Sequence, residues 1–149
     1  TPLVEAGQAV PLFSLGVMNE EGVIVRDPAF PDLPTFSELY LAQPGASRDD
    51  VAYEVFHKFF ASGYALQKLL LVPKQVDAKL LARYRAGAKD LTTNEDFLVA
   101  ARQQVGPYEP VVGEVAAKQL ASAMELSDAR RQWVVDWLKD RYGVRVVTR

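Results

Sequence analysis

The stretch AGQAVPLFSLGV, residues 6–17, decides the fold class of this chain. Its apolar residues follow one another from Ala9 onward instead of alternating with polar ones, which is typical of a strand buried on both faces of a sheet. We therefore predict a strand from about Val10 to Val17. The run Leu66–Val72 predicts a second strand, because it is apolar and ends at Pro73. Two strands leave this apolar sheet incomplete, so we expect part of the native sheet to lie upstream of residue 1.

Helix signals dominate the rest of the sequence. Thr35 and Glu38 form the Ser/Thr-x-x-Glu pattern of a capping box and predict a short helix over residues 36–42. A short amphipathic segment is expected over residues 2–6, before Gly7. Residues 19–34 contain three prolines and predict an ordered loop. The remaining helices are expected after Ser47 or Asp49 up to Gly63, from Asp77, from Thr93 or Asn94 to Gly106, and over residues 114–142 with a break at Ser127 and Asp128.

Four of these helical segments carry apolar residues that predict a buried face. The apolar sets comprise Val51, Val55, Phe56, Phe59 and Phe60 in the first, Leu80, Leu81 and Tyr84 in the second, Phe97, Leu98 and Ala101 in the third, and Val115, Leu120, Met124, Trp133, Val134, Trp137 and Leu138 over residues 114–142. The order of elements predicts the α/β class, with many helices and a few-stranded sheet. We expect residues 1–149 to form a single α/β domain, or a fragment of a longer protein.

Composition excludes several classes of function. The chain has 149 residues, a formal net charge of −2 and a pI near 5.4, so it lacks the basic field that nucleic-acid binding requires. Cysteine is absent, which excludes disulfides, thiolate nucleophiles and the usual structural zinc sites. The apolar runs are far shorter than the roughly 20 residues that cross a bilayer.

No set of residues in the sequence suggests catalysis. His57 is the only histidine, so a Ser-His-Asp triad or a histidine metal site would depend on it alone. It lies between phenylalanines on a predicted helix, where a packing role is favoured. The adjacent carboxylates Glu20-Glu21 and Asp49-Asp50 do not face one another on a helix. Asp27 and Asp32 lie among prolines and are better suited to organising turns than to binding an ion. We predict a protein that is not an enzyme and that uses no cofactor or metal.

The run AGQAVPLFSLGV followed by RDPAFPDLPTFSEL, residues 26–39, resembles the tripartite tricarboxylate transporter solute-receptor family, the TctC or Bug-type periplasmic binding proteins. The resemblance continues downstream at LLVP, NEDF and PVVGE, and at Trp133. The matching residues of its most specific part are Arg26, Pro28, Pro31, Asp32, Pro34, Thr35 and Glu38. What matches is the C-terminal half of the family's proteins. The chain departs from the pattern at residues 45–63, at residues 73–76 and at Gln67 and Lys68.

The resemblance implies the C-terminal part of a periplasmic binding protein type II-like, or Venus-flytrap, fold. It also implies a non-catalytic receptor in the periplasm that binds a small organic anion, a carboxylate, and serves membrane transporter subunits. In such folds the ligand lies where strand ends and helix N-termini gather backbone N–H groups. The candidate ligand-binding residues are Asn19, just past the first predicted strand, and Gln67 and Lys68 at the second.

An alternative function stays open on the sequence alone. The chain is then a protein-interaction or structural module without a small-molecule site, and another polypeptide or a second copy completes its sheet. An apolar strand without neighbours in its own chain leaves unpaired backbone groups at a hydrophobic edge. We therefore expect self-association, with a symmetric dimer that exchanges the N-terminal strand or the final helices as the favoured geometry, or completion by a missing N-terminal half.

Overall fold

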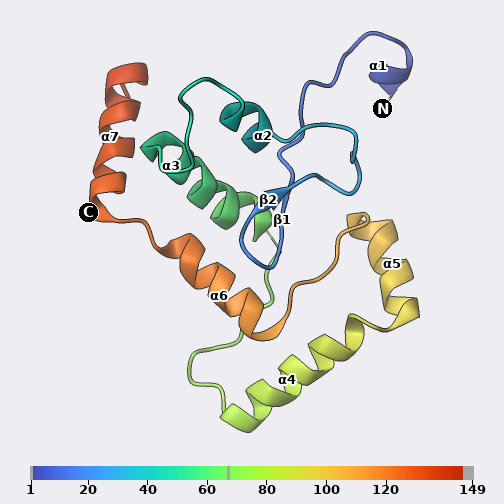
Figure 1. Cartoon of the computed structure of the whole chain (residues 1–149). Coiled ribbons are helices and arrows are strands. Elements are labelled where there is room, and N and C mark those ends of the chain that lie inside the picture. The colour runs from blue at the N-terminus through green and yellow to red at the C-terminus, as the bar shows by residue number, and fades with distance from the viewer. Residues whose placement is uncertain (1, 67, 146–149) are drawn as a thin grey trace.

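The computed structural model describes residues 2–66 and 68–145, and helices dominate this part of the chain (Figure 1). The helices are α1 (Pro2–Glu5), α2 (Phe36–Leu41), α3 (Val51–Phe60), α4 (Ala78–Leu91), α5 (Glu95–Val105), α6 (Gly113–Met124) and α7 (Asp128–Tyr142), and a π-helical turn, η1 (Ala61–Ala65), continues α3. Strands β1 (Val17–Met18) and β2 (Ile24–Val25) form an antiparallel hairpin in which Val17 faces Val25. The predicted class, α/β with many helices and a few-stranded sheet, is confirmed by these elements.

The first predicted strand is much shorter than the sequence indicates. Of the predicted strand, only Val17 belongs to β1. Before it, Ser14 forms a single parallel bridge with Thr35. Residues 9–13 lie outside helix and sheet, and Val10 and Leu12 are 80% and 72% exposed. The prediction of a buried strand from residue 10 is therefore wrong, because no strand among the described residues lies beside this segment to pair with it or cover it.

The second predicted strand, Leu66–Val72, is also wrong. Residues 69–73 form neither strand nor helix, and Leu70 is 90% exposed. Gly63 does not end the preceding helix but lies inside η1. An apolar run takes up strand geometry only where a neighbouring strand supplies hydrogen bonds, and the described residues supply none here.

The predicted helix starts are confirmed where a side chain caps the helix. Thr35 accepts a hydrogen bond from the backbone N–H of Glu38, and both halves of the capping box are present. Asp77, Asn94 and Ser127 cap α4, α5 and α7 in the same way. These caps act within three residues of sequence, which is why the sequence alone reveals them.

The hydrophobic core lies between the hairpin, α2 and α3. Aromatic rings join the segment before β1 to α2 and α3, with centroids 5.7 Å apart for Phe13 and Phe36, 4.7 Å for Phe36 and Phe56, and 6.1 Å for Phe56 and Phe60. The buried hydrophobic residues are Ile24, Tyr53, Val55, Phe60, Ala61 and Ala123. The predicted face of α3 is thus confirmed at Val55 and Phe60 and wrong at Val51 and Phe59, which are exposed.

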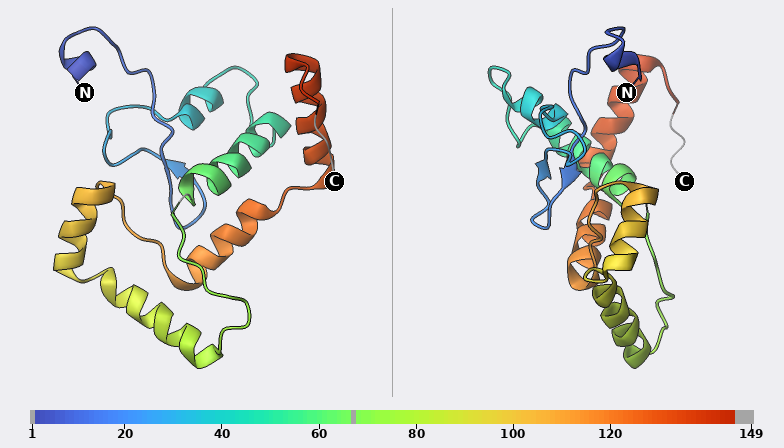
Figure 2. Two further views of the ribbon diagram at one scale, coloured as in Figure 1. Left: turned by 180° about the vertical axis from the view of Figure 1, so that it is seen from behind. Right: turned by 90° about the vertical axis from the view of Figure 1, so that its right-hand side faces the viewer.

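Helices α4 and α5 stand apart from this core and bury no residue (Figure 2). The predicted inward stripe of α4 is wrong at Leu80 and Tyr84, which are exposed, whereas Phe97 and Leu98 of α5 are half-buried. The apolar set predicted over residues 114–142 is wrong at Met124 and Trp137, which are exposed. The accessible surface is 11559 Å², against about 7,500 Å² for a typical folded monomer of this mass. The chain therefore leaves far more surface open than its size requires.

Candidate functional site

A cavity of about 360 Å³ lies where the hairpin turn, α3 and the start of α7 meet. Helix α3 supplies Tyr53, Glu54, His57 and Lys58. Counted from Tyr53 these are positions i, i+1, i+4 and i+5, which lie along one side of a helix. The other charged side chains at the cavity come from loops and from α7: Arg48, Glu125 and Arg130. The cavity thus gathers polar groups from segments far apart in the sequence.

His57 fixes the hairpin turn against α3. Its Nε2 lies 2.8 Å from the carbonyl oxygen of Gly22, and since a carbonyl only accepts, Nε2 carries the hydrogen and donates it. In the neutral ring Nδ1 is then left as an acceptor. His57 therefore packs against the hairpin, as the sequence favours, and it also lines the cavity.

Asn19 shapes the same turn. Its Oδ1 accepts a hydrogen bond from the backbone N–H of Val23 at 2.8 Å, and its backbone carbonyl accepts one from Gln119 Nε2 of α6 at 2.9 Å. The turn that Asn19 organises supplies Gly22, Val23 and Ile24 to the cavity wall. Asn19 does not line the cavity itself; the structure places it behind the wall as a residue that holds the turn.

Three cations at the cavity differ in how their hydrogen-bonding groups are used. Arg130 forms an ion pair with Glu54, and Lys58 Nζ donates to the carbonyl oxygen of Ser122 at 2.6 Å. Arg48, on the loop before α3, makes no hydrogen bond or ion pair with any residue that the structure describes. Its guanidinium therefore keeps all five donors for a ligand.

The remaining predicted site residues lie elsewhere. Lys68 is exposed on the segment after η1 and does not line the cavity. Gln67 lies outside the described residues. Sequence reasoning did not select Arg48, Lys58 or Arg130, because no motif marks them and only the packing of α3 against α7 brings them to one cavity.

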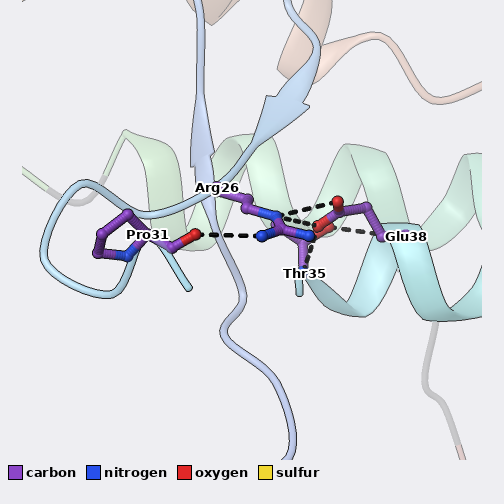
Figure 3. A network of polar contacts seen from close by, with 4 residues as sticks. All are labelled: Arg26, Pro31, Thr35 and Glu38. Atoms are coloured by element: carbon purple, nitrogen blue, oxygen red, sulfur yellow. Dashed lines mark hydrogen bonds and ion pairs between the residues drawn. The ribbon is translucent and has the colours of Figure 1, made fainter. Parts of the chain in front are cut away.

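A second polar cluster, formed by Arg26, Pro31, Thr35 and Glu38, joins the hairpin to α2 (Figure 3). Arg26 Nε donates to Glu38 Oε1 at 3.1 Å, and Arg26 Nη1 donates to the carbonyl oxygen of Pro31 at 3.2 Å. The backbone N–H of Thr35 donates to Glu38 Oε2 at 2.6 Å and lowers the pKa of Glu38, an effect to which Arg26 adds and which burial partly opposes. Every group here has a partner, so this cluster stabilises the fold.

The buried carboxylate of Asp27 holds a distant segment to the hairpin loop. It accepts hydrogen bonds from the backbone N–H of Ala29 at 2.8 Å and from the Tyr108 hydroxyl at 3.1 Å. Burial raises the pKa of Tyr108, and the hydrogen bond to Asp27 raises it further. The expected turn-organising role of Asp27 is confirmed by the bond to Ala29.

Comparisons with protein-family models, with curated proteins and with solved structures find no match to this chain. The resemblance to the solute receptors therefore rests on the sequence motifs alone. Among the described residues, no group of three or more His, Asp or Glu side chains is placed to hold a metal ion. None of the described helices has both the length and the apolar character needed to span a membrane.

Proposed function

We propose that this chain is a non-catalytic, solute-receptor-like module that binds a small organic carboxylate in the cavity between the hairpin, α3 and α7. The observation that carries the proposal is Arg48, a cavity guanidinium with no partner among the described residues. A guanidinium presents two parallel N–H donors to a carboxylate, which makes arginine the usual partner of such anions.

The other groups at the cavity favour a small ligand. A volume of about 360 Å³ lies at the lower end of the range for small-molecule pockets, roughly 300–1,000 Å³. Lys58 adds positive charge beside Arg48, the ion pair between Arg130 and Glu54 balances those two charges, and Glu125 is the remaining carboxylate at the cavity. Nδ1 of His57, the free acceptor of the neutral ring, suits a hydroxyl on the ligand. A hydroxycarboxylate meets both the cationic and the acceptor groups.

The sequence resemblance extends this proposal to a biological role. It favours a periplasmic receptor of a tripartite tricarboxylate-type transporter, with membrane transporter subunits as partners and a type II-like Venus-flytrap fold for the complete receptor. Binding without catalysis agrees with the use of the only histidine, since Nε2 of His57 is occupied by the Gly22 carbonyl. Asn19 then acts by holding the turn at the cavity wall.

Calorimetric titration with citrate, malate and the uncharged compound succinamide tests the proposal. We expect saturable binding of at least one of the two acids, no binding of succinamide, and an affinity at least tenfold weaker in the Arg48→Gln variant. Arg83→Gln is the matched control, because Arg83 is exposed on α4 and does not line the cavity. Absence of acid binding at millimolar concentrations, or equal losses in the two variants, would contradict the proposal.

A further inference from the structure

Glu125 brings an unused negative charge to the cavity. It is the C-cap residue of α6 and lines the cavity together with Arg48. Its carboxylate makes no hydrogen bond or ion pair with any residue that the structure describes, whereas the Glu54 carboxylate is paired with Arg130. Binding of a carboxylate by Arg48 gives Glu125 no role. A ligand at this site therefore meets a free negative group as well as a free positive one.

The end of α6, where Glu125 lies, suits a positive charge. The C-terminus of a helix is the negative end of its dipole, and the last turn of α6 contains no basic residue. One ammonium group from another helix is already held there, since Lys58 Nζ of α3 donates to the carbonyl oxygen of Ser122 at 2.6 Å and to its Oγ at 3.2 Å. Lys58 is bound to Ser122 and forms no ion pair with the described Glu125 carboxylate, so that carboxylate stays open to an ammonium group on the ligand.

The charges at the cavity also limit the charge of the ligand. The described residues bring three cationic side chains, Arg48, Lys58 and Arg130, and two carboxylates, Glu54 and Glu125, so one positive charge is in excess. A hydroxydicarboxylate carries two negative charges and leaves Glu125 facing a group of like charge, which is unfavourable. An ammonium group in place of the hydroxyl lowers the charge of that ligand to minus one and supplies the positive group that Glu125 lacks.

We propose that Glu125 makes this cavity selective for a carboxylate whose neighbouring carbon carries an ammonium group, that is, an amino acid. The inference rests on the proposed function: Arg48 binds the carboxylate, and Glu125 accepts hydrogen bonds from the ammonium group. The structure describes both residues, from the loop before α3 and the end of α6, and no ion pair between them, and both are exposed to an incoming ligand. Nδ1 of His57 accepts from an ammonium group as well as from a hydroxyl, so the charge of Glu125 decides between the two.

Calorimetric titration with aspartate and malate tests the selectivity. The two compounds share one carbon skeleton and differ in a single group, an ammonium in aspartate and a hydroxyl in malate. We expect the unmodified chain to bind aspartate at least about tenfold more tightly than malate, because a hydrogen bond between two charged groups is stronger than one from a hydroxyl. Equal affinities, or tighter binding of malate, would overturn the inference.

The Glu125→Gln variant assigns the selectivity to one residue. We expect it to bind aspartate at least about tenfold more weakly and malate equally well or more tightly, since the negative charge that repels malate is gone. Glu109→Gln is the matched control, because Glu109 is exposed and does not line the cavity, and it should keep the preference for aspartate. A general disturbance of the cavity would instead weaken both compounds in Glu125→Gln, and that result would count against a selective role for Glu125.

The same titrations separate this inference from the proposed function. Arg48→Gln should weaken the binding of both compounds, because both present a carboxylate to the guanidinium. If malate binds through Arg48 and aspartate binds no more tightly, the selectivity is wrong and the proposed function stands. If neither compound binds at millimolar concentrations, the proposed function is wrong and the inference is wrong with it.

Discussion

Residues 13–65, the packed region, and residues 78–105, the arm, form helices for the same local reasons but differ in what covers them. Thr35 caps α2 in the packed region, and Asp77 and Asn94 cap α4 and α5 in the arm. Yet the packed region holds five of the six buried hydrophobic residues, and the arm holds none. Good capping thus decides where a helix begins, and it does not decide whether the helix finds a core.

The comparison also explains the two apolar segments. Residues 10–12 and 69–72 flank the packed region and carry the hydrophobicity of buried strands, but no strand in the described part of the chain lies beside them. Periodicity reports which residues need to be covered. It cannot report which polypeptide covers them. The two regions differ in this respect, because the apolar residues of the packed region are covered within the described chain and those of the arm are not.

Truncation of an aromatic ring should give the largest difference in stability loss between the packed region and the arm. Phe60→Ala removes a ring that is 4% exposed and contacts Phe56 and Tyr64, so we expect a loss of about 3–5 kcal/mol in the free energy of unfolding. Tyr84→Ala in the arm removes a ring that is 54% exposed and should change it by no more than about 0.5 kcal/mol. Urea unfolding followed by circular dichroism measures both, and similar losses would show that the arm is packed after all.

Glycine substitution should give the next largest contrast. Gly16 has a φ of +81°, and an added Cβ would collide with the Val25 carbonyl oxygen and lie 2.9 Å from Ile24 Cγ2. We therefore expect Gly16→Ala to destabilise the packed region by at least about 1–2 kcal/mol, the cost of the left-handed conformation alone.

Gly87 in α4 is the matched control for Gly16. It has an ordinary helical conformation and open space around its Cα, so Gly87→Ala should stabilise the arm by up to about 1 kcal/mol. Thermal unfolding of the two variants should shift in opposite directions. A shift in the same direction would mean that the hairpin can relax around a side chain at residue 16.

Sequence information was sufficient for the class, for the caps of α2, α4, α5 and α7 and for the turn at Asp27, because the caps and the turn rest on contacts within a few residues. The cap predicted for α3 at Ser47 or Asp49 is wrong, since Asp50 precedes this helix without a side-chain cap. Sequence information also failed for the two strands and for the inward face of α4, since those predictions assume neighbours that the described residues lack. The cavity shows the same limit. Asn19 was selected and proves to hold its wall, but Arg48 and Arg130 reach the cavity only through packing between segments about 80 residues apart.

The smallest expected effect is the loss of folding stability at acidic pH. The pKa of Glu38 is lowered below its ordinary value of 4.5, first by the Thr35 backbone N–H and then by Arg26, so folding favours the charged carboxylate. A group with a lowered folded pKa stabilises the protein above its unfolded pKa, and the contribution is lost as the pH falls through the folded value. We therefore expect the packed region to lose stability below about pH 4.5 in part through Glu38.

Substitution by glutamine isolates this contribution. Glu38→Gln can keep the capping-box hydrogen bond but cannot titrate, so the unmodified chain should be the more stable one at pH 7, and the difference should shrink as the pH falls below 4.5. Glu114→Gln breaks the exposed ion pair between α6 and Arg85 of the arm and serves as the control. Urea midpoints measured from pH 7 down to pH 3 compare the three proteins. If the gap between the unmodified chain and Glu38→Gln stays constant across that range, the carboxylate of Glu38 does not sense the fold, and the polar cluster at α2 contributes through its shape alone.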